Sequence, residues 1–268
     1  MNDIINYISR ELGGAPPALT AAYLVVGVLI VIMSVVCLAL EIRVWLCYRK
    51  ANKRGISTNM TGIESARYVL DQAGLTQVKV RKAGFIREAI FGNYYNVVTK
   101  TIYLRSWLGK IDNKTSVTST ALGVQKAAIA RLCEEGDEQA KMRGKLSLLG
   151  IFGPLLFIPI ILIGMIIDYL VMKDITIISY ASMAFSGLLL VAGFIVTWLN
   201  IPVEKRANAL ALRMMRDYGL ANEDELEMMA EVYDAYILSY IAQFILEVLR
   251  VVQWILEIII RMQNKNSD

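Results

Sequence analysis

The residues best suited to metal chemistry lie in a short acidic run behind a predicted helix. The run offers one thiol and four carboxyl groups, from Cys133, Glu134, Glu135, Asp137 and Glu138. A thiolate and carboxylates can bind a transition metal, but charges that cluster after a helix end are more typical of a solvated loop. The chain also has no histidine, the commonest ligand of catalytic zinc. We therefore expect no metal at this run.

Nucleophilic catalysis has little support either. A serine or cysteine nucleophile needs a neighbouring base, and without histidine the remaining arrangement is a pairing of Ser116 or Ser119 with Lys126, which no motif supports. The glycines at 150–153 and 187–193 lack the strand, turn and helix context of a phosphate loop, and indicate close helix packing instead. We therefore assign no catalytic residue.

The elements that would carry such residues belong to a membrane protein. The chain has 268 residues, of which 56% are hydrophobic, and its mean hydropathy is +0.49, too apolar for a soluble domain. Its long apolar runs can cross a hydrocarbon core of about 30 Å. We predict an extracytoplasmic segment over 1–18, transmembrane helices over 19–47, 145–172 and 175–201, a cytoplasmic α+β domain over 48–144, a cytoplasmic helical connection over 202–232 and a fourth helix over 235–262.

The fourth helix differs from the other three in its polar residues. They recur at helical spacing and gather on one face, at Gln243, Glu247, Arg250, Gln253 and Glu257. Such a face is costly against lipid tails, so we expect it to contact other helices, another subunit or the water interface. The helix either spans the bilayer or lies amphipathically at its surface.

The basic residues set the orientation. Lysine and arginine crowd the segment 49–143, whereas the opposite side has little beyond Arg10 and Lys173. The positive-inside bias therefore places this middle segment in the cytoplasm. Because topology and anionic lipid headgroups account for such a basic surface, we expect membrane lipids and no nucleic acid as partners.

The cytoplasmic segment has signals for both helices and strands. Thr61 and Glu64 fit a capping box, which opens a helix that should end at Gly74. Gly92 and Asn93 form a turn ahead of two tyrosines. We predict strands over 77–82 and 101–105 and a second helix over 116–132. This segment is predicted to be a compact α+β unit.

From about residue 50 onward, the chain resembles the neutral zinc metallopeptidases of bacterial membranes, the YugP-like proteins. The resemblance depends on the order and spacing of several short motifs. They are Met60-Thr61-Gly62, Glu64-Ser65-Ala66-Arg67, Gly74-Leu75, a strand pair near Tyr95 and Leu104, Pro202-Val203-Glu204, Ala207, Ala209-Leu210 and Tyr218-Gly219-Leu220. The resemblance implies a multi-pass protein of the bacterial inner membrane whose soluble domain has a zincin-like core helix and strands.

The resemblance also implies an HExxH helix, from which this chain departs. In that motif two imidazoles hold zinc and the glutamate activates the bound water. The aligned positions are Gln125-Lys126-Ala127-Ala128-Ile129. Gln125 and Ile129 would replace the ligands and Lys126 the general base, while Glu204 matches the third ligand. The alternative without a functional role is that Glu204 is a carboxylate at the cytoplasmic end of a membrane helix.

These departures predict a catalytically inactive homologue, a pseudoprotease, with no cofactor. Its retained body would serve as a binding, scaffolding or regulatory subunit at the membrane. Its partner would be another membrane protein or an active homologue, in a homo- or hetero-oligomer. The alternatives are an active membrane peptidase with an unrecognised site and a structural membrane protein.

Loss of zinc would leave the carboxylate of Glu204 unpaired in a partly buried site, which is costly. Lys126 offers an ammonium and Gln125 an amide donor on the same helix turn. We therefore predict that Lys126 or Gln125 contacts Glu204. The alternative is that Glu204 faces solvent or pairs with its neighbour Arg206.

Overall fold

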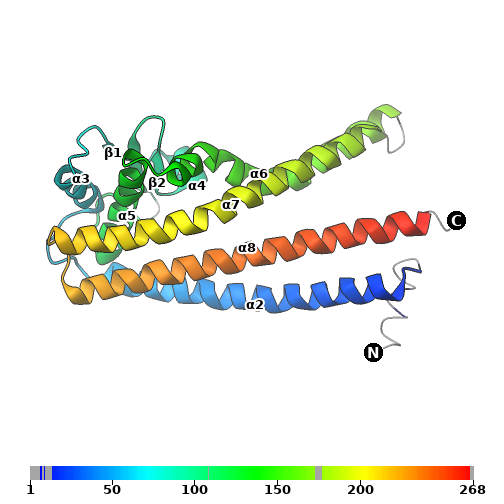
Figure 1. Cartoon of the computed structure of the whole chain (residues 1–268), viewed down its shortest axis with the longest axis horizontal. Coiled ribbons are helices and arrows are strands. Elements are labelled where there is room, and N and C mark those ends of the chain that lie inside the picture. The colour runs from blue at the N-terminus through cyan, green and yellow to red at the C-terminus, as the bar shows by residue number, and fades with distance from the viewer. Residues whose placement is uncertain (1–6, 8, 10–13, 108, 173–176, 266–268) are drawn as a thin grey trace. The chain divides into compact units, whose positions relative to one another are not determined.

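The structure, a computed structural model, describes residues 7, 9, 14–107, 109–172 and 177–265. The described chain is mostly helical, with one small sheet (Figure 1). In chain order its elements are α2 (Pro17–Lys53), α3 (Gly62–Gln72), β1 (Lys79–Lys82), α4 (Phe85–Phe91), β2 (Tyr94–Asn96), β3 (Thr101–Leu104), α5 (Val117–Glu134), α6 (Glu138–Met172), α7 (Ile177–Asp217) and α8 (Glu223–Lys265).

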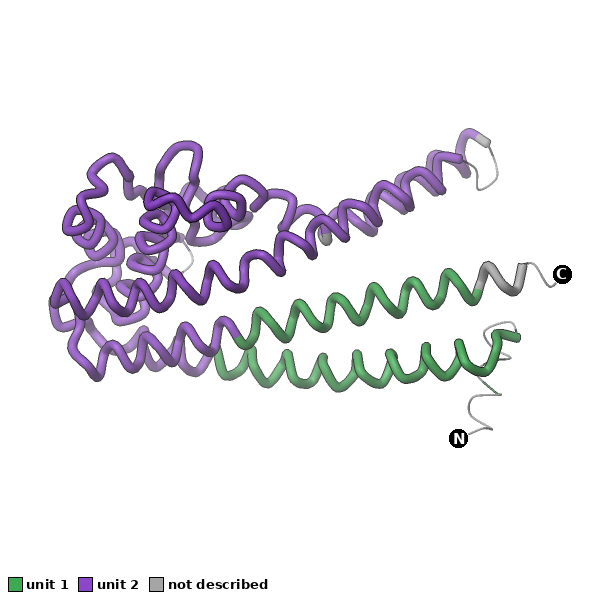
Figure 2. The backbone as a smooth tube through the Cα atoms, viewed as in Figure 1, with its two compact units in different colours: residues 1–44, 238–268 green, residues 45–237 purple. Residues whose placement is uncertain are grey.

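The chain divides into two compact units, which Figure 2 colours separately. Unit 1 combines Met1–Val44 with Leu238–Asp268, and unit 2 is Trp45–Ile237. Within unit 1, α2 and α8 pack through Cys37, Ala242 and Leu246. Unit 2 contains the sheet, the helices around it and the α6–α7 pair. The candidate site lies in unit 2.

Two helices, α2 and α7, are long and apolar enough to cross a membrane. A third span results if the two parts of α6, Glu138–Gly153 and Leu155–Val171, count as one despite a bend of 47° between them. The bend falls between Gly153 and Leu155. Within the described residues α8 does not meet the same test. The number of passes and the cytoplasmic orientation stay predictions.

The polar face of α8 has a partner within unit 1. Glu41 of α2 accepts hydrogen bonds from Ser239 Oγ at 2.6 Å and from Gln243 Nε2 at 2.5 Å. Gln243 therefore faces another helix, as its place in the polar stripe predicted. A carboxylate that accepts two hydrogen bonds costs much less free energy between apolar helices than an unpaired carboxylate.

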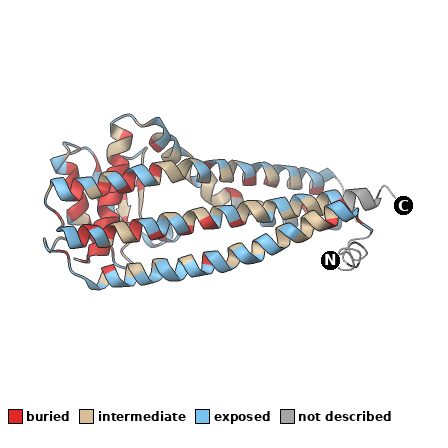
Figure 3. Ribbon diagram, turned by 60° about the horizontal axis from the view of Figure 1, so that its bottom comes forward, coloured by how far each residue is buried: buried red, intermediate tan, exposed pale blue. Residues whose placement is uncertain are grey.

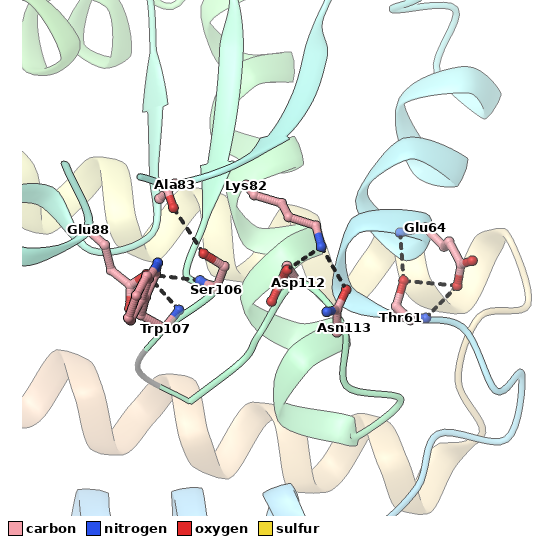
Figure 4. Close-up of polar contacts among 9 residues, drawn as sticks. All are labelled: Thr61, Glu64, Lys82, Ala83, Glu88, Ser106, Trp107, Asp112 and Asn113. Atoms are coloured by element: carbon pink, nitrogen blue, oxygen red, sulfur yellow. Dashed lines mark hydrogen bonds and ion pairs between the residues drawn. The ribbon is translucent and has the colours of Figure 1, made fainter. Parts of the chain in front are cut away.

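Several elements around the sheet of unit 2 follow from local sequence signals. The capping box at Thr61 and Glu64 is present, with Thr61 Oγ1 accepting from the Glu64 amide and the Glu64 carboxylate accepting from the Thr61 amide (Figure 4). The helix it opens is α3, and Gly74 follows it with a positive φ of 72°, a conformation that suits glycine. The predicted strands appear as β1 and β3, each slightly shorter.

The sheet is three-stranded, in the order β1-β3-β2. Strand β1 runs parallel to β3 in a register that pairs Val80 with Ile102, and β2 runs antiparallel to β3. Helix α4, which lies between β1 and β2 in the chain, was not predicted. At seven residues it is too short to show a periodic pattern.

Helix α5 is the centre of unit 2 and is buried along most of its length. Its small residues allow close contact, because a Cβ at Gly123 would overlap the backbone of Gly62 on α3. Figure 3 shows buried residues gathered around the sheet and α5, and mostly exposed residues along the apolar helices. Polar side chains on α5 therefore enter the core and need partners there.

Helix α7 extends past the predicted spanning segment, which ended at Ile201. It continues without a break through Pro202 to Asp217, within the segment predicted as a helical connection. Proline costs a helix one backbone bond, which surrounding packing can offset. Buried Val203 and Ala207 supply such packing. The same helix thus reaches from its apolar part into the core around α5 and positions Glu204 there.

Candidate functional site

The candidate site is a group of polar side chains between α5, α6 and α7. Helix α5 supplies Gln125 and Lys126, each only 8% exposed. Helix α7 supplies Glu204 and, one turn later, Asn208. Helix α6 supplies Arg143, near its first turns. We call these five residues the Glu204 cluster.

Glu204 is the common acceptor of this cluster. Its Oε2 accepts from Gln125 Nε2 at 2.8 Å. Its Oε1 accepts from Arg143 Nη2 and lies 3.9 Å from Lys126 Nζ. The predicted contact of Glu204 with Gln125 or Lys126 is therefore confirmed, and Gln125 makes the closer one. The alternative is wrong, because Arg206 bonds Asp137 instead, at 2.9 Å.

Gln125 also links two acceptors of α7. Its amide Nε2 donates to Asn208 Oδ1 at 2.7 Å as well as to Glu204. An amide has two N–H groups, so one side chain can satisfy both acceptors. Gln125 therefore joins α5 to two successive turns of α7.

Burial and charge determine the ionisation of the cluster. The side chain of Glu204 is 16% exposed and that of Lys126 is 11% exposed. Burial favours the neutral carboxyl group, but the charges of Arg143 and Lys126 outweigh it and lower the pKa of Glu204 below its ordinary value. Burial lowers the pKa of Lys126, and Glu204 only partly opposes this effect. Glu204 is consequently a carboxylate at neutral pH.

Ile129 has no polar role in the structure. It is 3% exposed and belongs to the hydrophobic core that also contains Val203 and Ala207. An alkyl side chain has no lone pair for a metal. The assignment of Gln125, Lys126 and Ile129 to the motif positions stays a prediction from the resemblance.

Two members of the cluster escaped the sequence reasoning. Asn208 had a usable signal, since it lies four residues after Glu204 and thus on the same helix face. Arg143 had none, because it is one of many basic residues in its segment and only the tertiary fold brings it to Glu204. Tyr233, also unpredicted, packs on α5 and donates its hydroxyl to the Ala121 carbonyl.

The acidic run after α5 does not converge on one point. Its carboxylates have separate cationic partners: Glu134 pairs with Lys100 at 2.6 Å, Glu135 with Arg131 at 2.7 Å, Asp137 with Arg206 at 2.9 Å and Glu138 with Lys141 at 3.0 Å. Burial raises the pKa of Cys133 to about 11, so its thiol stays protonated at neutral pH. Across the described part of the chain no group of three or more metal-binding side chains comes together.

The serine residues considered for catalysis support the start of α5. Ser116 caps the helix by accepting from the Ser119 amide at 3.2 Å, and its hydroxyl donates to Ser119 Oγ at 3.1 Å. Lys126 lies roughly two turns beyond Ser119 and nearly three beyond Ser116, and it is directed to Glu204. The structure thus gives these serines a capping role.

Comparison with known proteins identifies the family. A family model described as "Putative neutral zinc metallopeptidase" matches residues 26–259. The chain belongs to this family. No curated protein and no solved structure matches significantly. The match extends well beyond the segments on which the resemblance was based, and it includes α5, α6 and α7 with the whole Glu204 cluster.

The side chains of the cluster do not fit the zinc ion that the family description implies. Zinc is bound by thiolate, imidazole and carboxylate groups. The cluster offers one carboxylate and the amide oxygens of Gln125 and Asn208, together with the guanidinium of Arg143 and the ammonium of Lys126. The two cationic groups next to the carboxylate would repel a divalent cation. They also already occupy lone pairs of the carboxylate that a metal would need. The chemistry of this site is therefore that of an internal ion pair.

Proposed function

We propose that this member of the neutral zinc metallopeptidase family is a pseudoprotease, a non-catalytic subunit that binds, scaffolds or regulates other proteins at the membrane. The observation that carries the proposal is the set of contacts around Glu204. The carboxylate that the family resemblance aligns with the third zinc ligand is held by Gln125, Lys126 and Arg143. These groups supply the positive charge and the cross-link that a metal would supply.

The Glu204 cluster can stabilise the family fold without a metal. A structural cross-link must join separate elements, and this one joins α5, α6 and α7 within unit 2. A buried carboxylate without a counter-charge would destabilise the fold, whereas a paired and hydrogen-bonded one is tolerated. We infer that this cross-link lets the chain keep a stable body without a metal.

Such a body suits a membrane-anchored binding role. We propose that α2, α6 and α7 anchor the chain in the membrane and that the soluble part of unit 2 lies on the cytoplasmic side. Its partner would be another membrane protein or an active homologue, in a homo- or hetero-oligomer. Copurification from native membranes after crosslinking, with the Glu204→Ala variant as a control for the integrity of the body, would identify that partner.

Activity distinguishes this proposal from its competitors. The purified full-length chain in detergent should not cleave a mixed peptide library at a rate above that of a mock preparation, with or without a zinc chelator. Chelator-sensitive cleavage would contradict the proposal, because it requires a metal centre. Cleavage that the chelator leaves unchanged would also contradict it, and would favour a peptidase with a different site.

A further inference from the structure

An exposed apolar patch surrounds the short helix α4. Phe85 is 63% exposed and Ile86 73% exposed on α4, and Trp107, which follows β3, is 68% exposed. The rings of Phe85 and Trp107 meet edge to face with centroids 5.6 Å apart. Ile90 extends the patch along α4 at 38% exposure. We call these four residues the α4–Trp107 patch. Contiguous large apolar side chains on a surface mark an interaction site.

A buried carboxylate holds the two parts of the patch together. Glu88 is 2% exposed, and its Oε2 accepts from the backbone amides of Ser106 at 2.9 Å and Trp107 at 3.0 Å (Figure 4). Ser106 Oγ donates to the Ala83 carbonyl at 3.0 Å, just ahead of α4. The tryptophan is thus fixed beside α4 in the folded protein. Its exposure follows from a defined local structure that presents the ring outward.

The chain around the patch is strongly basic. Over residues 79–110 the only acidic residue is Glu88, which is buried. The basic residues of this range are Lys79, Arg81, Lys82, Arg87, Lys100, Arg105 and Lys110. Arg87 lies on α4 itself and is exposed, as is Lys110 near Trp107. Aromatic and aliphatic side chains with cations around them match a surface that is anionic outside and apolar inside.

Two close approaches place this region next to the end of the first predicted span, over 19–47, and next to the start of the second, over 145–172. A Cβ at Gly109 would lie 3.3 Å from the hydroxyl of Tyr48, the residue directly after the predicted first span. A Cβ at Gly144 would overlap the side chain of Val97 in the β2–β3 turn, and Gly144 directly precedes the predicted span over 145–172. Strand β2 in turn contacts α4, since the rings of Phe91 and Tyr94 are 4.8 Å apart.

We propose that the α4–Trp107 patch rests on the anionic headgroups of the bilayer that holds the chain. Phe85, Ile86 and Trp107 enter the interfacial layer, where tryptophan is favoured, and Arg87 and Lys110 contact lipid phosphates. The positive charge of the region and its place beside the ends of the apolar segments favour the anionic bilayer surface as the partner, rather than a soluble peptide. The contact fixes the height of the soluble domain above the membrane, whether or not the Glu204 cluster replaces a metal.

Spin-label accessibility of the full-length chain in lipid nanodiscs tests the proposal. One variant carries a nitroxide at Ile86→Cys, and its matched control carries one at Gln72→Cys, an exposed site on α3. Both are made in a background with Cys37, Cys47 and Cys133 replaced by alanine. The probes are oxygen, which partitions into lipid, and a water-soluble nickel chelate. The discs contain phosphatidylcholine alone or a mixture with phosphatidylglycerol.

We expect the ratio of oxygen to nickel collisions at position 86 to rise several-fold on addition of phosphatidylglycerol, while the ratio at position 72 stays constant. Adding Arg87→Gln and Lys110→Gln should reduce that rise. Equal ratios at positions 86 and 72 in anionic discs would overturn the proposal. Protection of position 86 that appears only in discs with more than a single chain would also overturn it, because it indicates a protein partner.

Hydrogen exchange of the unmodified chain gives an independent measurement that needs no substitution. The amides of α4 should exchange several-fold more slowly in anionic discs than in neutral ones, and those of α3 should exchange equally in both. Equal exchange of α4 in the two kinds of disc would overturn the proposal even if the labelled variants fail to fold.

Discussion

Two carboxylates of unit 2, the largely buried Glu204 and the fully buried Glu88, have partners that differ in kind. Glu204 is held by charged and amide side chains from two other helices, α5 and α6, at separations of 61 to 79 residues in the sequence. Glu88 is held by two backbone amides from a segment fewer than twenty residues away. The first arrangement ties large elements together through charge, and the second shapes a local surface through neutral donors. Loss of the carboxylate should therefore have different consequences at the two sites.

The largest effect is expected from Glu204→Ala. The substitution leaves Arg143 and Lys126 buried beside each other without a counter-charge, which should lower the free energy of unfolding by about 3 to 5 kcal/mol. Thermal unfolding of the purified chain in detergent measures the loss. Glu231→Ala is the matched control, because Glu231 forms an exposed pair with Lys50 at 3.2 Å and its loss should cost only about 0 to 1 kcal/mol. Equal losses of stability in the two variants would contradict a structural role for the Glu204 cluster.

A smaller effect is expected from Glu88→Ala. It deprives the amides of Ser106 and Trp107 of their acceptor, at a cost of about 2 to 3 kcal/mol. Because those amides are neutral, the loss should be confined to the neighbouring loop, with faster hydrogen exchange at 105–110 and unchanged exchange in α5. If α5 loosened as much as the loop, the local role of Glu88 would be refuted.

Gln125→Leu sharpens the comparison within the cluster. It keeps the ion pairs of Glu204 but leaves the buried Asn208 oxygen without its donor, so the free energy of unfolding should fall by about 1 to 2 kcal/mol. The same unfolding measurement applies, with Gln139→Leu as the control on the exposed start of α6. A loss as large as that of Glu204→Ala would show that hydrogen bonding, rather than charge, dominates the site.

The pH dependence gives the smallest signal. Arg143 and Lys126 hold the pKa of Glu204 below its ordinary value of 4.5. The carboxylate therefore contributes its stability above that ordinary pKa, and the contribution disappears as the pH falls through the lowered pKa. The difference in unfolding free energy between the wild-type chain and Glu204→Gln should be constant near neutral pH and shrink in acid. A difference that grows in acid would mean that the pKa is raised.

The two carboxylates also differ in how well the sequence predicted their surroundings. The contact of Glu204 with Gln125 followed from a family resemblance and the need to pair a buried charge. Arg143 did not follow, because its position depends on how α6 packs against α7. Glu88 was missed altogether, since α4 is too short for a periodic pattern and its burial depends on the loop after β3.

Local chemistry was more predictable than long-range packing elsewhere as well. The capping box and the start of α5 depend on residues within one turn, which the sequence displays directly. The apolar runs identified α2 and α7, because composition alone decides whether a helix is long and apolar enough to span. The continuation of α7 through Pro202 depends on packing that the sequence does not display.

The zinc content of the purified full-length chain tests the central claim most directly. The chain should be expressed in zinc-supplemented medium, purified without chelator and measured by mass spectrometry of the metal per mole of protein. The variant Gln125→His, Lys126→Glu, Ile129→His, which restores the motif at the predicted positions, serves as the comparison. We predict no stoichiometric zinc in the wild-type chain and a higher zinc content in the restored variant. A tightly bound zinc ion in every wild-type chain would contradict the account.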